Sequence, residues 1–211
     1  RRSGALFGVS CDRFGEACQE WFAGLDSHIE ASFLGCAASG GAMAFGTPGH
    51  GEALKAGVGA VFVWERQGRN WFYAAKLIHG EGKLADALGW SMDLEQDLLI
   101  AGAPYRDDLG FGQTGAVYVW NLIDGTWTET AKLIASDIGQ DDNFGWDVAT
   151  DGERIIVHAQ NDDPYQSTGI GSVYVFKQGA SGAWCEEQKL VAPDSGFVRV
   201  FGDDVDLRGT V

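Results

Sequence analysis

One segment of this chain recurs twice at a constant step, and this repeat constrains the fold more than any other feature. Residues 59–64 (Gly-Ala-Val-Phe-Val-Trp) return as residues 115–120 (Gly-Ala-Val-Tyr-Val-Trp) and as residues 171–176 (Gly-Ser-Val-Tyr-Val-Phe). Other markers recur at the same or nearly the same step: a tryptophan (Trp71, Trp127, Trp184), a Lys-Leu pair (Lys76, Lys132, Lys189) and a residue before glycine (Leu88, Phe144, Phe201). Self-similarity at such a long, fixed period is typical of solenoids and propellers.

Each unit is predicted to form four strands. In the unit that starts at Phe144, the apolar runs predict strands over residues 144–150, 154–159, 171–177 and 184–191. Asp151-Gly152 between two apolar runs predicts a hairpin turn, because glycine accepts a positive φ without strain. Side chains alternate along a strand, and in the third run both alternating sets are apolar. Such a sheet needs a neighbour on each face, which is the arrangement of propeller blades.

The repeat predicts that the whole chain belongs to one all-β domain. The predicted pieces are strands three and four of a partial blade (residues 1–33), three blades (34–87, 88–143 and 144–200) and the first strand of a next blade (201–211). Three full and two partial blades favour a part of a larger ring, or an arc that a partner completes, because an open arc would expose unpaired strand edges.

The repeated motif resembles the FG-GAP repeat, as found in integrin α-like propellers and some fungal lectins. Its elements are, in order, Phe-Gly, Gly-Ala-Pro, Gly-x-Val-Tyr-Val, Trp and Lys-Leu. The second complete unit matches best, with Leu88-Gly89 and Gly102-Ala103-Pro104. The resemblance implies a β-propeller, usually seven-bladed, that is used for adhesion or ligand binding. In the third unit His158-Ala159-Gln160 replaces Gly-Ala-Pro, and no unit has the Asp-x-Asp-x-Asp-Gly calcium loop of integrin-type repeats.

The net charge of the chain limits the classes of partner that it is expected to bind. The formal net charge is −15, from 15 basic and 30 acidic residues, with a pI near 4.4. Such a field repels nucleic acid and anionic membrane surfaces and attracts cations and basic partners. No apolar run reaches the roughly 18–20 residues that a spanning helix needs, so direct membrane insertion is not expected.

Acidic residues in the predicted loops are candidate calcium ligands, since calcium takes six to eight oxygens. The candidates are Asp107, Asp108, Asp137, Asp141, Asp142, Asp162 and Asp163. The alternative is that these carboxylates form turns by accepting bonds from their own backbone. Calcium is the one cofactor that the sequence suggests.

Two cysteines are candidates for a disulfide. Cys11 would end one strand and Cys18 would begin the next strand of the same hairpin, so a cross-strand disulfide is expected if register brings them together. Cys36 takes a motif tryptophan's place and is expected to be buried, and Cys185 has no evident partner. A disulfide would favour an extracellular, cell-surface or lumenal location.

The recurring tryptophans are predicted to pack between blades, and the alternative is that exposed rings stack on sugars. His158 lies near Asp162 and Asp163, but no nucleophile motif accompanies it, so the chain is not expected to be an enzyme. We expect a non-catalytic binding or adhesion scaffold that engages a protein partner, or the remaining blades of its propeller, through loops. The alternatives are a glycan-binding lectin with sites between blades and an accessory domain of a larger hydrolase.

Overall fold

The computed structural model describes residues 35–51, 57–81, 85–108, 110, 112–163, 169–193 and 201–208. Twelve strands form three four-stranded antiparallel sheets, and the described residues contain no helix. None of them therefore forms a helix long and apolar enough to cross a membrane. The predicted all-β class is confirmed, whereas the number of blades in a complete ring stays a prediction.

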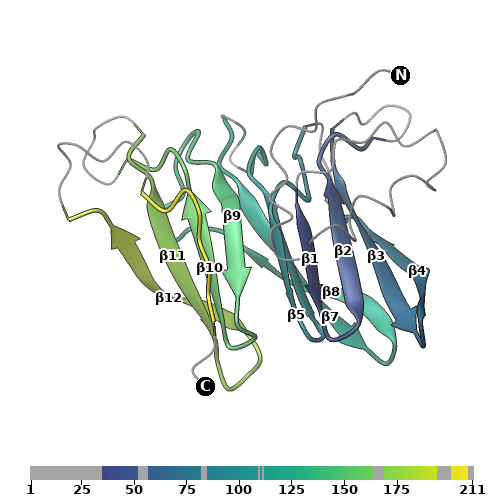
Figure 1. Cartoon of the computed structure of the whole chain (residues 1–211). Helices are drawn as coiled ribbons and strands as arrows, with labels where there is room; N and C mark the ends of the chain where they lie inside the picture. Colours follow the sequence, from purple (N-terminus) through teal and green to yellow (C-terminus); the bar gives the residue numbers. More distant parts are fainter. Residues whose placement is uncertain are drawn as a thin grey trace.

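The three sheets stand side by side, and within each sheet the strands follow the order of the chain (Figure 1). Sheet 1 contains β1 (Cys36–Ser39), β2 (Ala42–Thr47), β3 (Ala60–Gln67) and β4 (Asn70–Leu77). Sheet 2 contains β5 (Met92–Glu95), β6 (Leu98–Ala103), β7 (Ala116–Ile123) and β8 (Thr126–Leu133). Sheet 3 contains β9 (Phe144–Thr150), β10 (Arg154–Ala159), β11 (Ser172–Gln178) and β12 (Trp184–Val191).

The strands of sheet 3 agree closely with those predicted from the sequence. β9, β10 and β12 have the predicted limits, and β11 lies one residue further along than predicted. This agreement reflects local signals, because the Asp151-Gly152 turn and the alternation of apolar side chains both act over a few residues.

The first strand of a further blade, expected over residues 201–211, is not formed over the described residues 201–208. In the three sheets each first strand is hydrogen-bonded to its second strand. Residues 201–208 have no second strand beside them among the described residues, and this explains their irregular conformation.

Residues 201–208 nevertheless begin at the place where a further sheet would begin. The Leu88 amide donates to the Val58 carbonyl (3.0 Å), and the Phe144 amide donates to the Thr114 carbonyl (3.1 Å). The Phe201 amide makes the corresponding bond to the Ile170 carbonyl (2.7 Å). The residue before each motif glycine therefore ties its segment to the start of the preceding third strand.

The motif glycines are required by close backbone contact between neighbouring sheets. A Cβ atom on Gly46 would overlap the backbone oxygen of Gly89, and a Cβ atom on Gly102 would overlap that of Gly145. Each pair joins the end of a second strand to the start of the following sheet, so only glycine permits this approach.

The hydrophobic core lies between the sheets. Val61 and Val63 of β3 share one buried cluster with Tyr118 and Trp120 of β7. In the next interface, Val117 and Val119 share a cluster with Tyr174 and Phe176 of β11. One face of β7 therefore contacts sheet 1 and the other contacts sheet 3. Burial of each such side chain stabilises the fold by roughly 1.5–3 kcal/mol.

The strand order places the long connections at one end of the sheets. The loops β2–β3, β6–β7 and β10–β11 lie at the same end as the loops β4–β5 and β8–β9, at the top of Figure 1. We call this end the loop end. The short turns within the β1–β2 and β3–β4 hairpins lie at the opposite end.

Candidate functional site at the loop end

Three aromatic rings gather at the loop end between sheets 2 and 3. The ring centroids of Trp90 and Trp146 are 4.8 Å apart, and Tyr105 lies 5.2 Å from Trp90 and 6.2 Å from Trp146. All three side chains are half-buried. The contact between Trp90 and Trp146 confirms the predicted packing between repeats, and the partial exposure leaves part of these rings open to a ligand. We call these three residues the aromatic trio.

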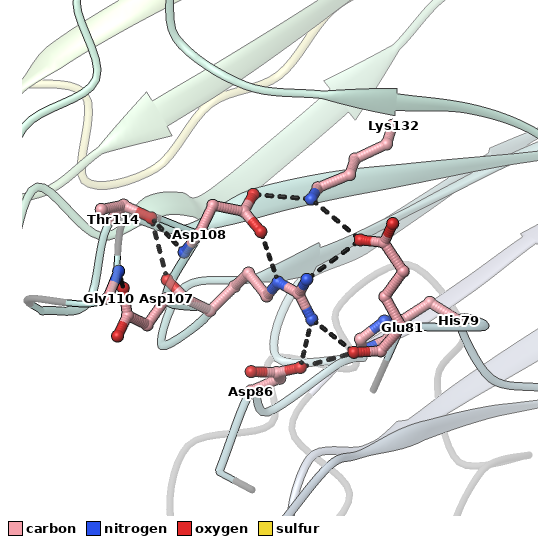
Figure 2. Close-up of polar contacts among 9 residues, drawn as sticks. His79, Glu81, Asp86, Asp107, Asp108, Gly110, Thr114 and Lys132 are labelled. Atoms are coloured by element: carbon pink, nitrogen blue, oxygen red, sulfur yellow. Dashed lines mark hydrogen bonds and ion pairs between the residues drawn. The ribbon is translucent and has the colours of Figure 1, made fainter. Parts of the chain in front are cut away.

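A buried arginine joins sheets 1 and 2 at the loop end. Arg106, in the β6–β7 loop, is 2% exposed. Its Nε donates to Asp108 Oδ1 (2.8 Å), its Nη1 to Asp86 Oδ2 (3.0 Å) and to the Glu81 carbonyl (2.8 Å), and its Nη2 to Glu81 Oε2 (3.0 Å). Figure 2 shows these contacts, which come from two different loops. We call this set, with His79, Tyr118 and Lys132, the Arg106 cluster.

Lys132 adds a second positive charge on the more exposed side of the Arg106 cluster. Its Nζ lies 2.6 Å from Asp108 Oδ2 and 3.4 Å from Glu81 Oε2 (Figure 2). Burial by itself disfavours charge on Arg106, but the hydrogen bonds that Arg106 donates to Asp108 and Asp86 outweigh it and raise the arginine pKa. Burial likewise raises the pKa of Asp108, but the bonds from Lys132 and Arg106 outweigh it, so the net shift is downward. Both groups are therefore held in their charged forms.

An imidazole and a phenol form the buried floor of the Arg106 cluster. His79 stacks on Tyr118 with ring centroids 4.3 Å apart and an angle of 22° between the planes. His79 Nε2 lies 3.3 Å from Asp86 Oδ2, but this contact lacks hydrogen-bond geometry. The Tyr118 hydroxyl has no hydrogen-bond partner among the residues that the structure describes. Burial raises the pKa of Tyr118, so the phenol is neutral.

A second cluster lies at the corresponding place between sheets 2 and 3. Lys189 Nζ lies 2.7 Å from Asp137 Oδ2 and 2.7 Å from Asp162 Oδ2. The Tyr174 hydroxyl donates to Asp137 Oδ1 (2.8 Å), and the Ser172 hydroxyl donates to Asp162 Oδ2. We call these residues, with Asp142, the Asp162 cluster.

Asp142 is the most perturbed carboxyl of the Asp162 cluster. It is 8% exposed, and its Oδ2 accepts a bond from the Gly139 amide (2.6 Å). Burial raises the pKa of Asp142 to about 6, and the nearby Asp162 and Asp137 add to this effect, while the Gly139 amide and Lys189 oppose it. Asp142 therefore carries an unfavourable charge at neutral pH.

The two clusters are related by the sequence repeat. Glu81 and Asp137 correspond, as do Asp86 and Asp142, Tyr118 and Tyr174, and Lys132 and Lys189. Arg106 corresponds to Asp162, so one position changes from a base to an acid. Over the described residues, the Arg106 cluster therefore contains three carboxylates, an arginine and a lysine, whereas the Asp162 cluster contains three carboxylates and one lysine.

The predicted calcium ligands do not form one site. Asp137, Asp142 and Asp162 come together in the Asp162 cluster, and Asp108 belongs to the Arg106 cluster. Asp107 accepts a bond from the Gly110 amide (2.5 Å), Asp163 from the Gly169 amide (2.6 Å) and Asp141 from the Gln113 amide (3.0 Å).

In the part of the chain that the structure describes, no group of three His, Cys, Asp or Glu side chains is placed to hold a metal ion. The carboxylates that do meet at the Asp162 cluster already bind the Lys189 ammonium, so they do not fit a calcium ion as they stand. A calcium site among the predicted ligands stays a prediction.

The remaining candidate residues from the sequence are the cysteines and His158. Cys11 and Cys18 lie outside the described residues. Cys36 is half-buried rather than buried, and Cys185 is exposed and forms no disulfide. His158 is fully buried.

Sequence reasoning missed His79, Asp86 and Arg106. A signal for one of them was present, because Asp86 and Asp142 are separated by the repeat period. Arg106 had no such signal, since the next unit has an acid at its position.

Comparison of the chain with known protein families finds one repeat family. The family model described as FG-GAP repeat matches residues 71–120 and residues 127–176. Each match begins in a fourth strand and ends in the third strand of the next sheet, so it spans a junction between sheets. No curated protein matches the chain.

Proposed function

The chain is an FG-GAP repeat protein over residues 71–176, and from this premise we propose that it is a non-catalytic binding module whose loop end engages a protein partner. FG-GAP repeats suggest a protein-interaction domain of the β-propeller class. They are typical of extracellular or lumenal proteins, and we place this chain there as part of the proposal. The partner we propose carries a basic segment.

The aromatic trio is the observation that carries this proposal. Trp90, Tyr105 and Trp146 are half-buried on each other, so their rings are held in place before a partner arrives. Rigid aromatic side chains are enriched at protein interfaces, because they bring a large contact area at a small cost in conformational entropy.

Charge supports a basic partner. The net charge of −15 gives the chain a negative field, and Asp141 and Asp163 are exposed at the loop end. Complementary charge steers the encounter and selects among partners more than it adds affinity. Exposed aromatic faces also favour cations, since the ring quadrupole attracts positive charge.

Two buried histidines support a non-catalytic role. His79 and His158, two of the three described histidines, are buried, and no described serine or cysteine is hydrogen-bonded to either ring. A general base must reach the proton that it removes, which neither buried ring can do from its present position.

Peptide display against the folded chain tests the proposal. We expect selected peptides to be basic, to bind more weakly as salt rises, and to lose at least about tenfold in affinity against Trp146→Ala or Tyr105→Ala. The matched control is Tyr73→Ala, because Tyr73 is 58% exposed on the outer strand β4 and does not belong to the trio. Selected peptides that bind the trio variants as tightly as the unchanged chain would overturn the proposal.

A glycan ligand is the second candidate, favoured by the same half-exposed rings, which can stack on the apolar face of a sugar. A glycan array with the unchanged chain and the two trio variants separates the candidates. Binding of neutral glycans that resists salt and requires Trp146 would favour a lectin, because screening weakens contacts between exposed charges.

A further inference from the structure

The junction between sheet 3 and residues 201–208 differs from the two junctions before it. Gly59 forms a parallel bridge with Leu88, and Gly115 forms one with Phe144. Gly171 and Phe201, which occupy the same positions, form no such bridge. The contact of Phe201 with Ile170 is retained, so the segment is docked but less closely joined.

A histidine side chain occupies the altered junction. His158 stands at the end of β10, where Gly46 and Gly102 stand at the ends of β2 and β6. A Cβ atom on Gly171 would first meet His158 Nε2, at 2.9 Å, whereas one on Gly59 or Gly115 would overlap the backbone of the next sheet. A Cβ atom on Gly202 would lie 3.3 Å from His158 Cδ2. The imidazole is therefore inserted between sheet 3 and the docked segment.

The inserted ring is buried with little support for a positive charge. His158 is 0% exposed, and among the described residues neither ring nitrogen has a partner in full hydrogen-bond geometry, although the Phe201 backbone is near enough to favour the charged ring in part. A buried imidazolium with so little compensation is costly, whereas a released segment would let water solvate it. Docking and protonation of this ring therefore oppose each other.

We propose that His158 makes the docking of residues 201–208 on sheet 3 sensitive to acid, so that protonation of the imidazole releases this segment. Release would separate sheet 3 from whatever follows Phe201 at this junction. The junctions at Gly46 and Gly102 contain no titratable side chain at the same position and are expected to stay closed.

The charged groups around the ring determine the direction of the effect. Asp147 on β9 lies opposite His158 in the strand register, and Asp203 lies on the segment. Gly171, just before β11, and Val173 of β11 are uncharged. Burial lowers the pKa of His158 to about 4, and Asp203 and the Phe201 backbone oppose this only in part. The released ring has an ordinary pKa near 6.5, so this group favours docking above that pH and disfavours it as the pH falls toward 4.

Asp147 acts in the opposite direction. Its Oδ2 accepts a bond from the Val205 amide (2.8 Å) and so holds the segment. Burial raises the pKa of Asp147 to about 6, and Asp204 and Asp203 add to this, against the Val205 and Val148 amides. Acid therefore strengthens docking through Asp147 between about pH 6 and pH 4, which offsets most of the effect of His158 in the unchanged chain.

Hydrogen exchange in the full chain can separate the two groups. The measured quantity is the protection factor of the Phe201 and Val205 amides, and the internal control is the Phe144 amide, which makes the corresponding bond one junction earlier. In the Asp147→Asn variant, the protection factors of these two amides should fall roughly tenfold or more between pH 7 and pH 5. This is the change expected when protonation of the imidazole alone is linked to release of the segment. The double variant D147N/H158F should show little change, and Phe144 should stay protected in both.

The proposal would be overturned if the protection factors of Phe201 and Val205 depended on pH in the same way in D147N and in D147N/H158F. It would also be overturned if these protection factors in D147N did not fall as the pH is lowered. If the double variant with phenylalanine does not fold, D147N/H158G replaces it, because glycine is the residue at the two earlier junctions. Loss of protection at Phe144 in parallel with Phe201 would also overturn it, since it would indicate global unfolding rather than release of the segment.

Discussion

Arg106 and Asp162 occupy the same position in consecutive sheets, one repeat apart, and carry opposite charges. Arg106 bridges the carboxylates of Glu81, Asp86 and Asp108, whereas Asp162 adds a carboxylate to a cluster in which Lys189 is the one cation among the described residues. The two junctions are therefore built on one backbone plan with different electrostatics. They should respond differently to mutation, pH and cations.

Replacement of Arg106 should destabilise the fold strongly. Arg106→Met removes the guanidinium that donates to Asp86 Oδ2 (3.0 Å), a carboxylate on a side chain that is 1% exposed. Breaking a buried pair typically costs about 3–5 kcal/mol, and we expect a loss of this order in the free energy of unfolding from urea denaturation. Arg208→Met is the control, because Arg208 is exposed and pairs with Asp206 at the surface. Similar midpoints for the two variants would contradict a structural role for the Arg106 cluster.

Replacement of Asp142 should stabilise the fold at neutral pH and not in acid. The pKa of Asp142 is raised to about 6 in the folded state from an ordinary 3.8, so the folded chain gains stability as pH falls through this window. Asp142→Asn removes the cost of the buried charge and should raise the melting temperature at pH 7.5, with the difference shrinking toward pH 4. Asp141→Asn serves as the exposed neighbour. A gain for Asp142→Asn that is equal at both pH values would show that charge is not its cause.

The glycine at position 102 should not tolerate a methyl group. A Cβ atom there would overlap the Gly145 backbone oxygen, so Gly102→Ala must push sheets 2 and 3 apart. We expect a loss of about 1–3 kcal/mol or more, as for other overpacked positions. At Gly49 an added Cβ atom meets nothing within 4 Å, and Gly49→Ala is the matched control. Chemical denaturation of both variants checks this, and equal stabilities would refute the close approach of the two sheets.

Calcium binding can be tested at the Asp162 cluster. Lys189 Nζ is bonded to Asp137 and Asp162, so its ammonium already neutralises the carboxylates that a calcium ion would need. We expect calcium to raise the melting temperature of the unchanged chain little and that of Lys189→Met more, relative to chelator. Lys132→Met, in the Arg106 cluster, is the control. Equal melting in calcium and in chelator for all three proteins would rule against the predicted calcium site.

Much of the fold could be predicted from the sequence because its signals are local or periodic. Alternating apolar side chains and the Asp151-Gly152 turn determine strands over a few residues, and they placed β9, β10 and β12 correctly. The repeat period then extended this pattern along the chain. It also predicted that Trp90 and Trp146 pack between repeats, because a side chain that recurs at one phase meets its copy in the neighbouring sheet.

Only the tertiary structure decided how the loops meet. Contacts between loops depend on where distant segments lie, and they produce no periodic pattern in the sequence. Arg106 binds carboxylates that lie 20 and 25 residues earlier in the chain, a distance that its own neighbours do not encode. The sequence showed that His158 replaces a motif glycine, and the structure showed that its ring enters the junction with Phe201 and Gly202. Strand formation follows from backbone geometry and local pattern, whereas the chemistry of the junctions follows from packing.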